Sequence, residues 1–445
     1  MSDGVELAAT YYVPTAAPPP SGWPAVMLLH GLGLSRTAVE GATTTSANGI
    51  AEQYLAPNDY AVLTFDARAH GDSGGTFGLD GPREVQDVRE LFDWLASRPG
   101  VDRTRVGGSG ISYGGGALWR ATAEGVPFAT IVPIATWTDL ERSLFPQELT
   151  KSGVIAGFLG AIPESRYAPE LFQLRTDLLA STNLSAARQF AAARSVHSRL
   201  TTIRIPVFLG QGRRDFAFDI DQALDAYRAL PGPKRLYIGD FGHAPSANPP
   251  EEPPYLMAEV KLWFDRFLKG EPNGIDTRPP VELAPLPWTG KTVAYAGVPP
   301  TRTQTSTLRP PKRAIGASGK LVFTLPKSTR RQETFGRPVV RLSATGTFPH
   351  VVATLSALTP AGETVVSSGG TAATLSSRGQ TLTISMLSTS TPIPKGSRLR
   401  LTIAGTSLAQ NRANLLYLVN VPDGRTLRLR WARLSVPFLR TPVSQ

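Results

Sequence analysis

Residues 106–116 read Val106-Gly107-Gly108-Ser109-Gly110-Ile111-Ser112-Tyr113-Gly114-Gly115-Gly116. They contain Gly-x-Ser-x-Gly centred on Ser112, between a short strand-like run and a helical run over 117–123. A serine on so sharp a strand-to-helix turn is held in a strained conformation with its hydroxyl exposed, and glycines at 110 and 114 avoid collisions in the turn. This context predicts that Ser112 is a nucleophile. The pattern alone would also fit a glycine-rich turn that happens to contain a serine.

Two backbone amides are candidates for an oxyanion hole. Tyr113 follows the serine at the start of a helix, where an N–H group stabilises a developing negative charge. Upstream, the apolar run 25–29 is typical of a buried parallel strand, and it ends in His30-Gly31-Leu32-Gly33. In α/β-hydrolases the second donor lies in the loop after such a strand, which here points to the N–H of Leu32. We expect His30 to brace this loop as a buried structural histidine.

Two later loops offer an acid and a base. Asp215 follows a strand that starts at residue 206, and His243 follows a strand over 234–238. The order Ser112, Asp215, His243 is the order of the α/β-hydrolase triad, which predicts His243 as the general base and Asp215 as the carboxylate that orients it. Asp219 is the alternative acid. His70, in a turn-rich loop after another strand, is the weaker alternative base.

Strands alternate with helices over the first part of the chain, which predicts an α/β fold with a parallel sheet covered on both faces. The catalytic domain is expected to comprise 1–135 and 201–275. Between these ranges, 136–200 reads as a helical cap inserted over the active site. Trp137, Phe145 and Phe158 either line an acyl pocket in this cap or form its core. The expected strands are 5–13, 25–29, 61–65, 129–134 and 234–238, with another from 206; the expected helices are 83–97, 153–159, 168–179, 185–193, 222–230 and 254–269.

The character of the sequence changes after a proline-rich stretch, 276–290, which we interpret as a linker. From 291 to 445, short alternating runs are separated by Gly, Pro, Ser and Thr, which predicts an all-β jelly-roll sandwich. The expected strands are 320–325, 339–343, 351–355, 381–384, 399–403, 415–419 and 427–434.

Charge is unevenly distributed along the chain. The formal net charge is +11, yet residues 291–445 carry 21 Lys and Arg against three acidic residues, whereas 1–290 carry 25 against 32. A basic second part predicts contact with an anionic surface such as the cell envelope or a polymer, without specific nucleic-acid recognition. The alternative is an arginine-rich composition that serves solubility.

The composition also excludes several classes of site. There are no cysteines, which excludes disulfides, thiolate metal sites and a cysteine nucleophile. No metal-ligand spacing is present, and the predicted chemistry needs no metal or organic cofactor. The longest apolar run, 25–29, is too short to span a membrane. No signal peptide is visible, so we expect either a secreted or envelope protein whose leader has been removed, which we favour, or a cytoplasmic protein.

These motifs resemble the X-prolyl dipeptidyl-peptidase and cocaine-esterase-like family of serine hydrolases. The resemblance covers nearly the whole chain, because that family pairs an α/β-hydrolase domain with a C-terminal β jelly roll. It implies the same roles for Ser112, His243 and Asp215. Many members use a tyrosine side chain as an oxyanion donor in the loop after the early strand, whereas the loop at 30–33 has none. The matching pieces are Ser2-Asp3-Gly4-Val5, Asp66-x-Arg68, Gly71-x-Ser73-x-Gly75, Gly110-Ile111-Ser112-Tyr113-Gly114-Gly115, Gly212-Arg213-Arg214-Asp215 and Gly242-His243.

The sequence therefore predicts a serine hydrolase that cleaves an ester, or an amide, in a small or polymeric substrate through an acyl-enzyme. One alternative is an X-Pro dipeptidyl-peptidase or aminopeptidase. The cap is short for that activity, and no acidic cluster for a substrate's amino terminus is evident in the sequence. Another alternative is a polymer- or envelope-binding protein with a vestigial hydrolase domain. The acyl group, the leaving group and the oligomeric state stay open at this point.

Overall fold

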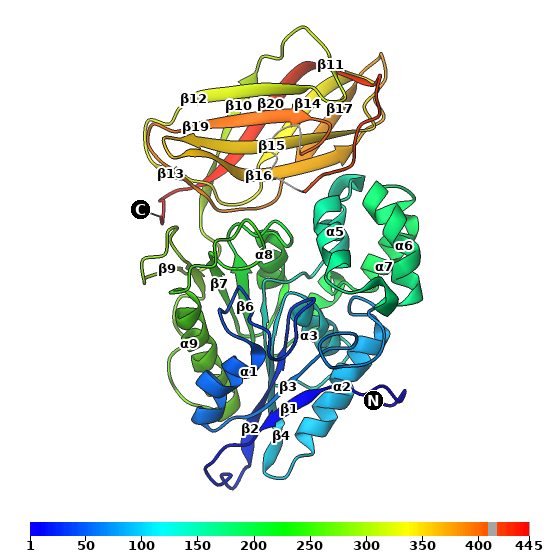
Figure 1. Cartoon of the computed structure of the whole chain (residues 1–445). Coiled ribbons are helices and arrows are strands. Elements are labelled where there is room, and N and C mark those ends of the chain that lie inside the picture. Colours follow the sequence, from blue (N-terminus) through cyan, green and yellow to red (C-terminus); the bar gives the residue numbers. More distant parts are fainter. Residues whose placement is uncertain (408–415, 445) are drawn as a thin grey trace.

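The computed structural model describes residues 1–407 and 416–444 of the chain. A large sheet with helices on both faces forms the lower part of the molecule, and a β-sandwich lies above it (Figure 1). A group of helices, α5 to α7, lies beside the junction of the two (Figure 1). In the described part of the chain, no helix is long and apolar enough to cross a membrane.

The large sheet contains nine strands in the order β1-β3-β2-β4-β5-β6-β7-β8-β9. Neighbouring strands from β3 to β8 are parallel, while β1 and β9 are antiparallel at the two edges. The parallel α/β sheet predicted from the sequence is confirmed. The strands are β1 (Ala9–Tyr12), β2 (Trp23–Leu29), β3 (Ala61–Phe65), β4 (Val101–Ile111), β5 (Thr130–Ile134), β6 (Val207–Gly212), β7 (Lys234–Gly239), β8 (Val281–Leu283) and β9 (Val293–Tyr295).

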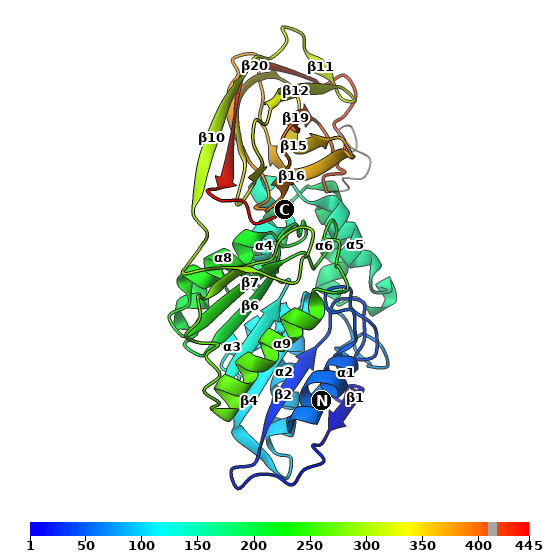
Figure 2. The ribbon, with the colours of Figure 1, turned by 90° about the vertical axis from the view of Figure 1, so that its left-hand side faces the viewer.

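Both faces of this sheet are buried, which explains why its strands read as continuous apolar runs. In β2, Met27 packs in the hydrophobic cluster on one face, whereas Val26 and Leu28 pack in the cluster on the other. The first cluster includes residues of α2, α3 and α8, and the second includes residues of α1 and α9. Figure 2 shows α9 running along its face of the sheet. These helices are α1 (Ala47–Ile50), α2 (Pro82–Ala96), α3 (Tyr113–Ala123), α8 (Ile220–Ala229) and α9 (Pro253–Phe264).

The chain between β5 and β6 forms the cap. Its helices bury their apolar faces in a cluster of their own, which also takes in residues of the loops beneath. The three cap helices predicted from the sequence are each found within one residue of their expected ends. The cap helices are α4 (Leu140–Leu144), α5 (Ser152–Gly160), α6 (Pro169–Ala180) and α7 (Leu184–Ala192), and short 3₁₀ or π segments occur here and elsewhere, namely η1 (Ala51–Leu55), η2 (Ala56–Asn58), η3 (Pro146–Glu148), η4 (Glu164–Arg166), η5 (His197–Thr202) and η6 (Asp265–Lys269).

The C-terminal part is the predicted β-sandwich. One antiparallel sheet has the order β10-β20-β14-β17, with β11 also paired to β20, and the other has the order β12-β19-β15-β16. Their facing side chains form one apolar core. The strands are β10 (Thr301–Leu308), β11 (Ile315–Gly316), β12 (Lys320–Lys327), β13 (Gln332–Glu333), β14 (Val339–Gly346), β15 (His350–Thr359), β16 (Gly362–Ala372), β17 (Gln380–Ser385), β18 (Pro392–Ile393), β19 (Arg398–Ala404) and β20 (Thr426–Leu439).

One strand expected in the sandwich is not found over the part of it that the structure describes. The expected strand 415–419 begins at Leu415, outside the described residues, and Leu416 to Val419 have no strand structure. Leu416 and Tyr417 instead pack in a small buried cluster with Leu149 of the cap. The apolar character of Leu416 and Tyr417 is therefore explained by burial at the junction with the cap, and Leu416 to Val419 take no part in a sheet.

The range expected to be a linker, 276–290, contributes a buried strand of the large sheet. Within it, β8 pairs in parallel with β7, and Val281 and Leu283 are fully buried. Glu282 between them forms an ion pair with the buried Arg235, so the central charge of the strand is neutralised. Because prolines lie on both sides of this strand, the sequence has the composition of a linker and does not predict the strand. The sheet also continues beyond residue 290, because β9 pairs with β8.

Buried charges join the sandwich to the lower part of the molecule. Arg213, directly after β6, forms a fully buried ion pair with Glu333 of β13. Glu333 also accepts hydrogen bonds from the N–H groups of Val443 and Ser444, at 2.7 and 2.9 Å. The junction therefore reaches to within two residues of Asp215.

Candidate active site

Ser112 lies on the sharp turn that the sequence predicts. It stands between β4 and α3 with φ 53° and ψ −113°, a conformation that an L-residue adopts only under strain. A Cβ at Gly110 would lie 2.3 Å from the carbonyl oxygen of Gly114, and one at Gly114 would lie 2.3 Å from that of Leu29. The two glycines are thus required by close backbone contacts, and the turn presents the serine at the carboxyl end of the sheet.

Ser112, His243 and Asp215 come together as the sequence predicts. The Oγ of Ser112 is 2.9 Å from Nε2 of His243, and Nδ1 of that ring is 2.8 Å from Oδ2 of Asp215. Asp215 is completely buried, and its Oδ1 accepts hydrogen bonds of 2.9 Å from the N–H groups of Ala217 and Phe218. These bonds hold the carboxylate toward the imidazole.

The two alternative residues are engaged elsewhere. Asp219 accepts a hydrogen bond of 2.9 Å from the N–H of Ser388 and pairs with Arg337 of the sandwich. His70 is buried with its Nδ1 2.9 Å from the carbonyl oxygen of Arg68, and burial lowers its pKa to about 4. Neither takes part in the hydrogen bonds that link Ser112 to its neighbours.

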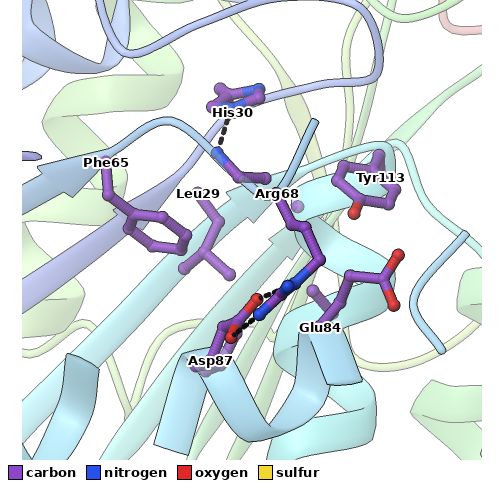
Figure 3. Close-up of a pocket in the computed structure, with 11 residues that line it drawn as sticks. Leu29, His30, Phe65, Arg68, Glu84, Asp87 and Tyr113 are labelled. Atoms are coloured by element: carbon purple, nitrogen blue, oxygen red, sulfur yellow. Dashed lines mark hydrogen bonds and ion pairs between the residues drawn. The ribbon is translucent and has the colours of Figure 1, made fainter. Parts of the chain in front are cut away.

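The loop with the expected second oxyanion donor is held by His30. Its Nε2 accepts a hydrogen bond of 2.9 Å from the N–H of Ala67 (Figure 3), and its Nδ1 is 2.8 Å from the carbonyl oxygen of Gly31. Because Nε2 accepts the hydrogen bond from Ala67, it carries no proton and the ring acts as a brace; burial also lowers the pKa of His30. Within the described chain, the N–H of Leu32 donates no hydrogen bond, and Leu32 lines the same cleft as Ser112.

Tyr113 can serve the site only through its backbone. It is the first residue of α3, so its N–H has no partner within the helix. Its side chain points into a small internal cavity of about 20 Å³, beside Glu84 (Figure 3). Leu29 and the ion pair of Arg68 with Asp87 also border this space, which has room for about one water molecule.

Two hollows meet at His243 and Phe158. The first, of about 260 Å³, contains Ser112, Leu32 and Glu40, and the second, of about 490 Å³, lies between α5, the loop after β6 and the edge of the sandwich. Phe158, one of the expected pocket residues, borders both hollows and remains a candidate for the substrate pocket.

Trp137 and Phe145 do not line either hollow. Each is only 2% exposed and packs in the core beneath the cap. Trp137 also donates a hydrogen bond of 3.0 Å from its indole to the carbonyl oxygen of Arg194. The alternative that these two aromatic residues form the cap's core is the correct one.

Glu40 is a residue of the site that the sequence analysis missed. Its Oε1 accepts a hydrogen bond of 3.0 Å from the N–H of Gly31, and it borders the hollow that contains Ser112. Burial raises its pKa to about 8, and no Lys or Arg of the described residues forms an ion pair with it. An isolated acid eleven residues after the end of a strand carries no motif, so only the fold reveals it.

The site has no cluster typical of a metal centre. Over residues 1–407 and 416–444, no group of three or more His, Cys, Asp or Glu side chains is arranged to hold a metal ion. Among the described residues that line the hollow with Ser112, the acidic and basic side chains are those of Glu40 and His243.

Comparison with known proteins gives several matches. The quorum-quenching protein AidA of Acinetobacter baumannii is 31% identical over 145 residues, which are 31% of this chain and 42% of that protein. A candidate Xaa-Pro dipeptidyl-peptidase of Streptomyces avermitilis is 25% identical over 288 residues, 58% of this chain and 41% of that protein. The chain thus spans about two fifths of the length of these curated relatives.

A solved structure matches almost the whole chain. It is a CocE/NonD family hydrolase of Staphylococcus aureus, with a TM-score of 0.74 and 15% sequence identity over 99% of this chain and 92% of that one. This likeness supports the pairing of an α/β-hydrolase fold with a C-terminal β-sandwich. The family model described as X-Pro dipeptidyl-peptidase (S15 family) matches residues 3–245, a range that runs from the first loop past Ser112 and Asp215 to His243. More than half of the chain follows that model, and the chain therefore belongs to the X-Pro dipeptidyl-peptidase (S15) family of hydrolases.

Proposed function

We propose that this protein is a serine hydrolase that cleaves carboxylic esters through an acyl-enzyme. The observation that carries the proposal is the continuous line of hydrogen bonds from Ser112 Oγ to His243 and on to Asp215, at 2.9 and 2.8 Å. A serine, an imidazole and a buried carboxylate in this arrangement form an activated nucleophile.

In the proposed reaction, Ser112 Oγ attacks the substrate carbonyl while its proton passes to Nε2 of His243. Asp215 accepts the hydrogen bond from Nδ1–H, which fixes the ring's tautomer and stabilises the imidazolium. The N–H groups of Tyr113 and Leu32 hold the oxyanion. His243 then protonates the leaving group, and the same residue activates the water that hydrolyses the acyl-enzyme.

The direct test is Ser112→Ala, measured on p-nitrophenyl acyl esters of increasing length. Loss of the nucleophile should lower kcat by about four to six orders of magnitude, because the three residues act as a unit. Ser109→Ala is the matched control: its hydroxyl, three residues earlier, is 3.2 Å from the carbonyl oxygen of Val132. If Ser112→Ala retained most of the activity, the proposed nucleophile would be wrong.

A second candidate function, release of dipeptides or amino acids from a free amino terminus, is supported by Glu40. An unpaired carboxyl group beside Ser112 has a raised pKa because its charge is poorly solvated, and a substrate ammonium would supply the missing partner. The test is turnover of Ala-Pro-p-nitroanilide with and without an acetylated amino terminus.

Glu40→Gln is the useful variant for this question, because a glutamine oxygen can still accept the hydrogen bond from Gly31. Under the peptidase proposal it should lower kcat/KM for the free amine by about tenfold or more and leave p-nitrophenyl ester turnover within about threefold. Equal loss on both substrates would mean that Glu40 only holds the oxyanion loop.

A further inference from the structure

The larger of the two hollows contains an arginine without a carboxylate partner. Arg214 lies between Arg213 and Asp215 in the chain and borders the hollow of about 490 Å³ together with His243. Its one hydrogen bond within the described chain is a long one, 3.4 Å, from Nη2 to the carbonyl oxygen of Val365 in β16. Its Nε is buried and has no acceptor there.

The nearby acids are engaged or distant. Glu363, which borders the same hollow, forms an ion pair of 2.9 Å with Arg400. Asp240 attracts Arg214 electrostatically but does not reach it, and the residues outside the described part, 408–415, include no Asp or Glu. Burial lowers the pKa of Arg214, the direction expected for a cation that lacks compensation.

The remaining walls of this hollow are mainly apolar. They include Val154 and Phe158 of α5, Phe216 of the loop after β6, and Leu416. A guanidinium presented at the side of an apolar hollow is suited to a molecule with an apolar body and an anionic end, because Arg binds carboxylates through a rigid fork of N–H donors.

The position relative to the catalytic groups indicates which part of a substrate would bind here. The hollow is bordered by His243 but not by Ser112, whereas the smaller hollow contains Ser112 and Leu32. The acyl carbon must reach Ser112 and the oxyanion donors, and the leaving group must reach the imidazole that protonates it. The larger hollow is therefore the leaving-group side.

We propose that Arg214 is a substrate-binding residue that pairs with a carboxylate carried by an apolar leaving group. This inference rests on the proposed function, since it assigns the substrate class of the same site. The preferred substrates would be esters whose released alcohol or phenol bears an acid group.

The test compares an anionic and a neutral aryl acetate that share the same ring: 4-acetoxybenzoic acid and its methyl ester. Arg214→Gln should lower kcat/KM for the acid by about tenfold to a hundredfold, mainly through KM, because it removes charge-assisted hydrogen bonds. The methyl ester should change by less than about threefold. Arg214→Lys should retain part of the kcat/KM for the acid, because the positive charge is kept. Arg103→Gln is the matched control, since Arg103 is exposed near the start of β4, whereas Ser112 follows the end of that strand.

A binding measurement separates this inference from the proposed chemistry. In the Ser112→Ala background, calorimetric titration with 4-hydroxybenzoate should give a Kd at least about tenfold weaker when Arg214 is also changed to Gln. Methyl 4-hydroxybenzoate should bind both proteins equally. Three outcomes would each overturn the role of Arg214. These are an equal loss of kcat/KM for the two acetates on Arg214→Gln, an unchanged Kd for 4-hydroxybenzoate on the same change, and no measurable binding of 4-hydroxybenzoate in the millimolar range. Loss of the proposed function itself would appear separately, as ester turnover that survives Ser112→Ala.

Discussion

The arginines of the lower, catalytic part of the molecule and those of the sandwich are used differently. In the catalytic part, Arg68, Arg194 and Arg235 are buried and each contacts a carboxylate. Of the sandwich arginines in the described part of the chain, only Arg337 and Arg400 form an ion pair. One region uses its positive charge to hold loops together, and the other exposes it to solvent.

The difference also explains how the two regions join. Glu333, one of three acids of the sandwich, forms an ion pair with Arg213. Arg337 forms ion pairs with Asp219 and Asp221. Both contacts lie on the loop that carries Asp215 or directly after it. Glu333 and Arg337 of the sandwich thus support the loop that carries Asp215, whereas Glu363 and Arg400 pair with each other within the sandwich.

The largest effect is expected when the two acids Asp215 and Asp219 are each replaced by Asn. Asp215→Asn should lower kcat by about 10³- to 10⁴-fold, because the amide supports the wrong imidazole tautomer. Asp219→Asn should lower kcat only a few-fold, since Asp219 pairs with the sandwich through Arg337. Steady-state kinetics on a p-nitrophenyl ester measures both. A collapse caused by Asp219→Asn alone would exchange the roles of the two acids.

The junction itself is tested by Glu333→Gln. This change leaves the fully buried Arg213 without its counter-charge and should lower the free energy of unfolding by about 3–5 kcal/mol. Urea denaturation measures the loss. Glu363→Gln is the control: its ion pair with Arg400 is partly exposed and should be worth about 1 kcal/mol or less. Similar losses for the two variants would show that burial does not distinguish the junction.

Glu40 provides a pH-dependent prediction. Its pKa in the folded protein is raised from 4.5 to about 8, so the folded state binds a proton more tightly than the unfolded state. Its contribution to stability is fully present below pH 4.5 and is lost as the pH rises through 8. Because the group borders a solvent-accessible hollow, we expect a loss of about 1–3 kcal/mol.

Glu40→Gln should remove that part of the pH dependence. Urea denaturation at the two ends of the range should show the variant close to the wild type in acid and more stable in alkali. An unchanged pH profile would mean that the folded and unfolded proteins ionise Glu40 alike.

The smallest effect on stability is expected on the outer face of the sandwich. We propose that this face binds an anionic polymer or envelope surface, and exposed Arg341, Arg428 and Arg433 are its best candidates. Changing all three to Gln should weaken retention on a heparin column, lower the salt needed for elution, and alter the free energy of unfolding by less than about 1 kcal/mol. Unaltered elution would favour the view that the arginines serve solubility.

Much of the site follows from short stretches of sequence. Gly110 and Gly114 around Ser112 impose the turn through contacts among neighbouring backbone atoms, and His243 follows a strand that is recognisable from its own residues. Parallel strands place their carboxyl ends at one edge of a sheet, so the loops that follow these strands are expected to lie together at that edge. Apolar strands that alternate with helices likewise predict a parallel sheet in the first part of the chain, and short alternating runs after residue 290 predict a sandwich.

Other features depend on contacts between distant segments. The pattern around Trp137 and Phe145 indicates burial but not whether a hollow lies beside them, and the short strand over 281–283 is stabilised by pairing with β7 rather than by its own composition. Glu40 and Arg214 carry no local signal, because what distinguishes each is the lack of a counter-charge. Local backbone sterics and hydrophobic periodicity are properties of a sequence, so the sequence by itself determined the sharp turn at Ser112, the order of Ser112, Asp215 and His243 along the chain, and the fold class. Desolvation and the pairing of charges are properties of the assembled molecule, so only the tertiary structure decided which acid meets His243, which aromatic residue borders the site and which charges are left for a ligand.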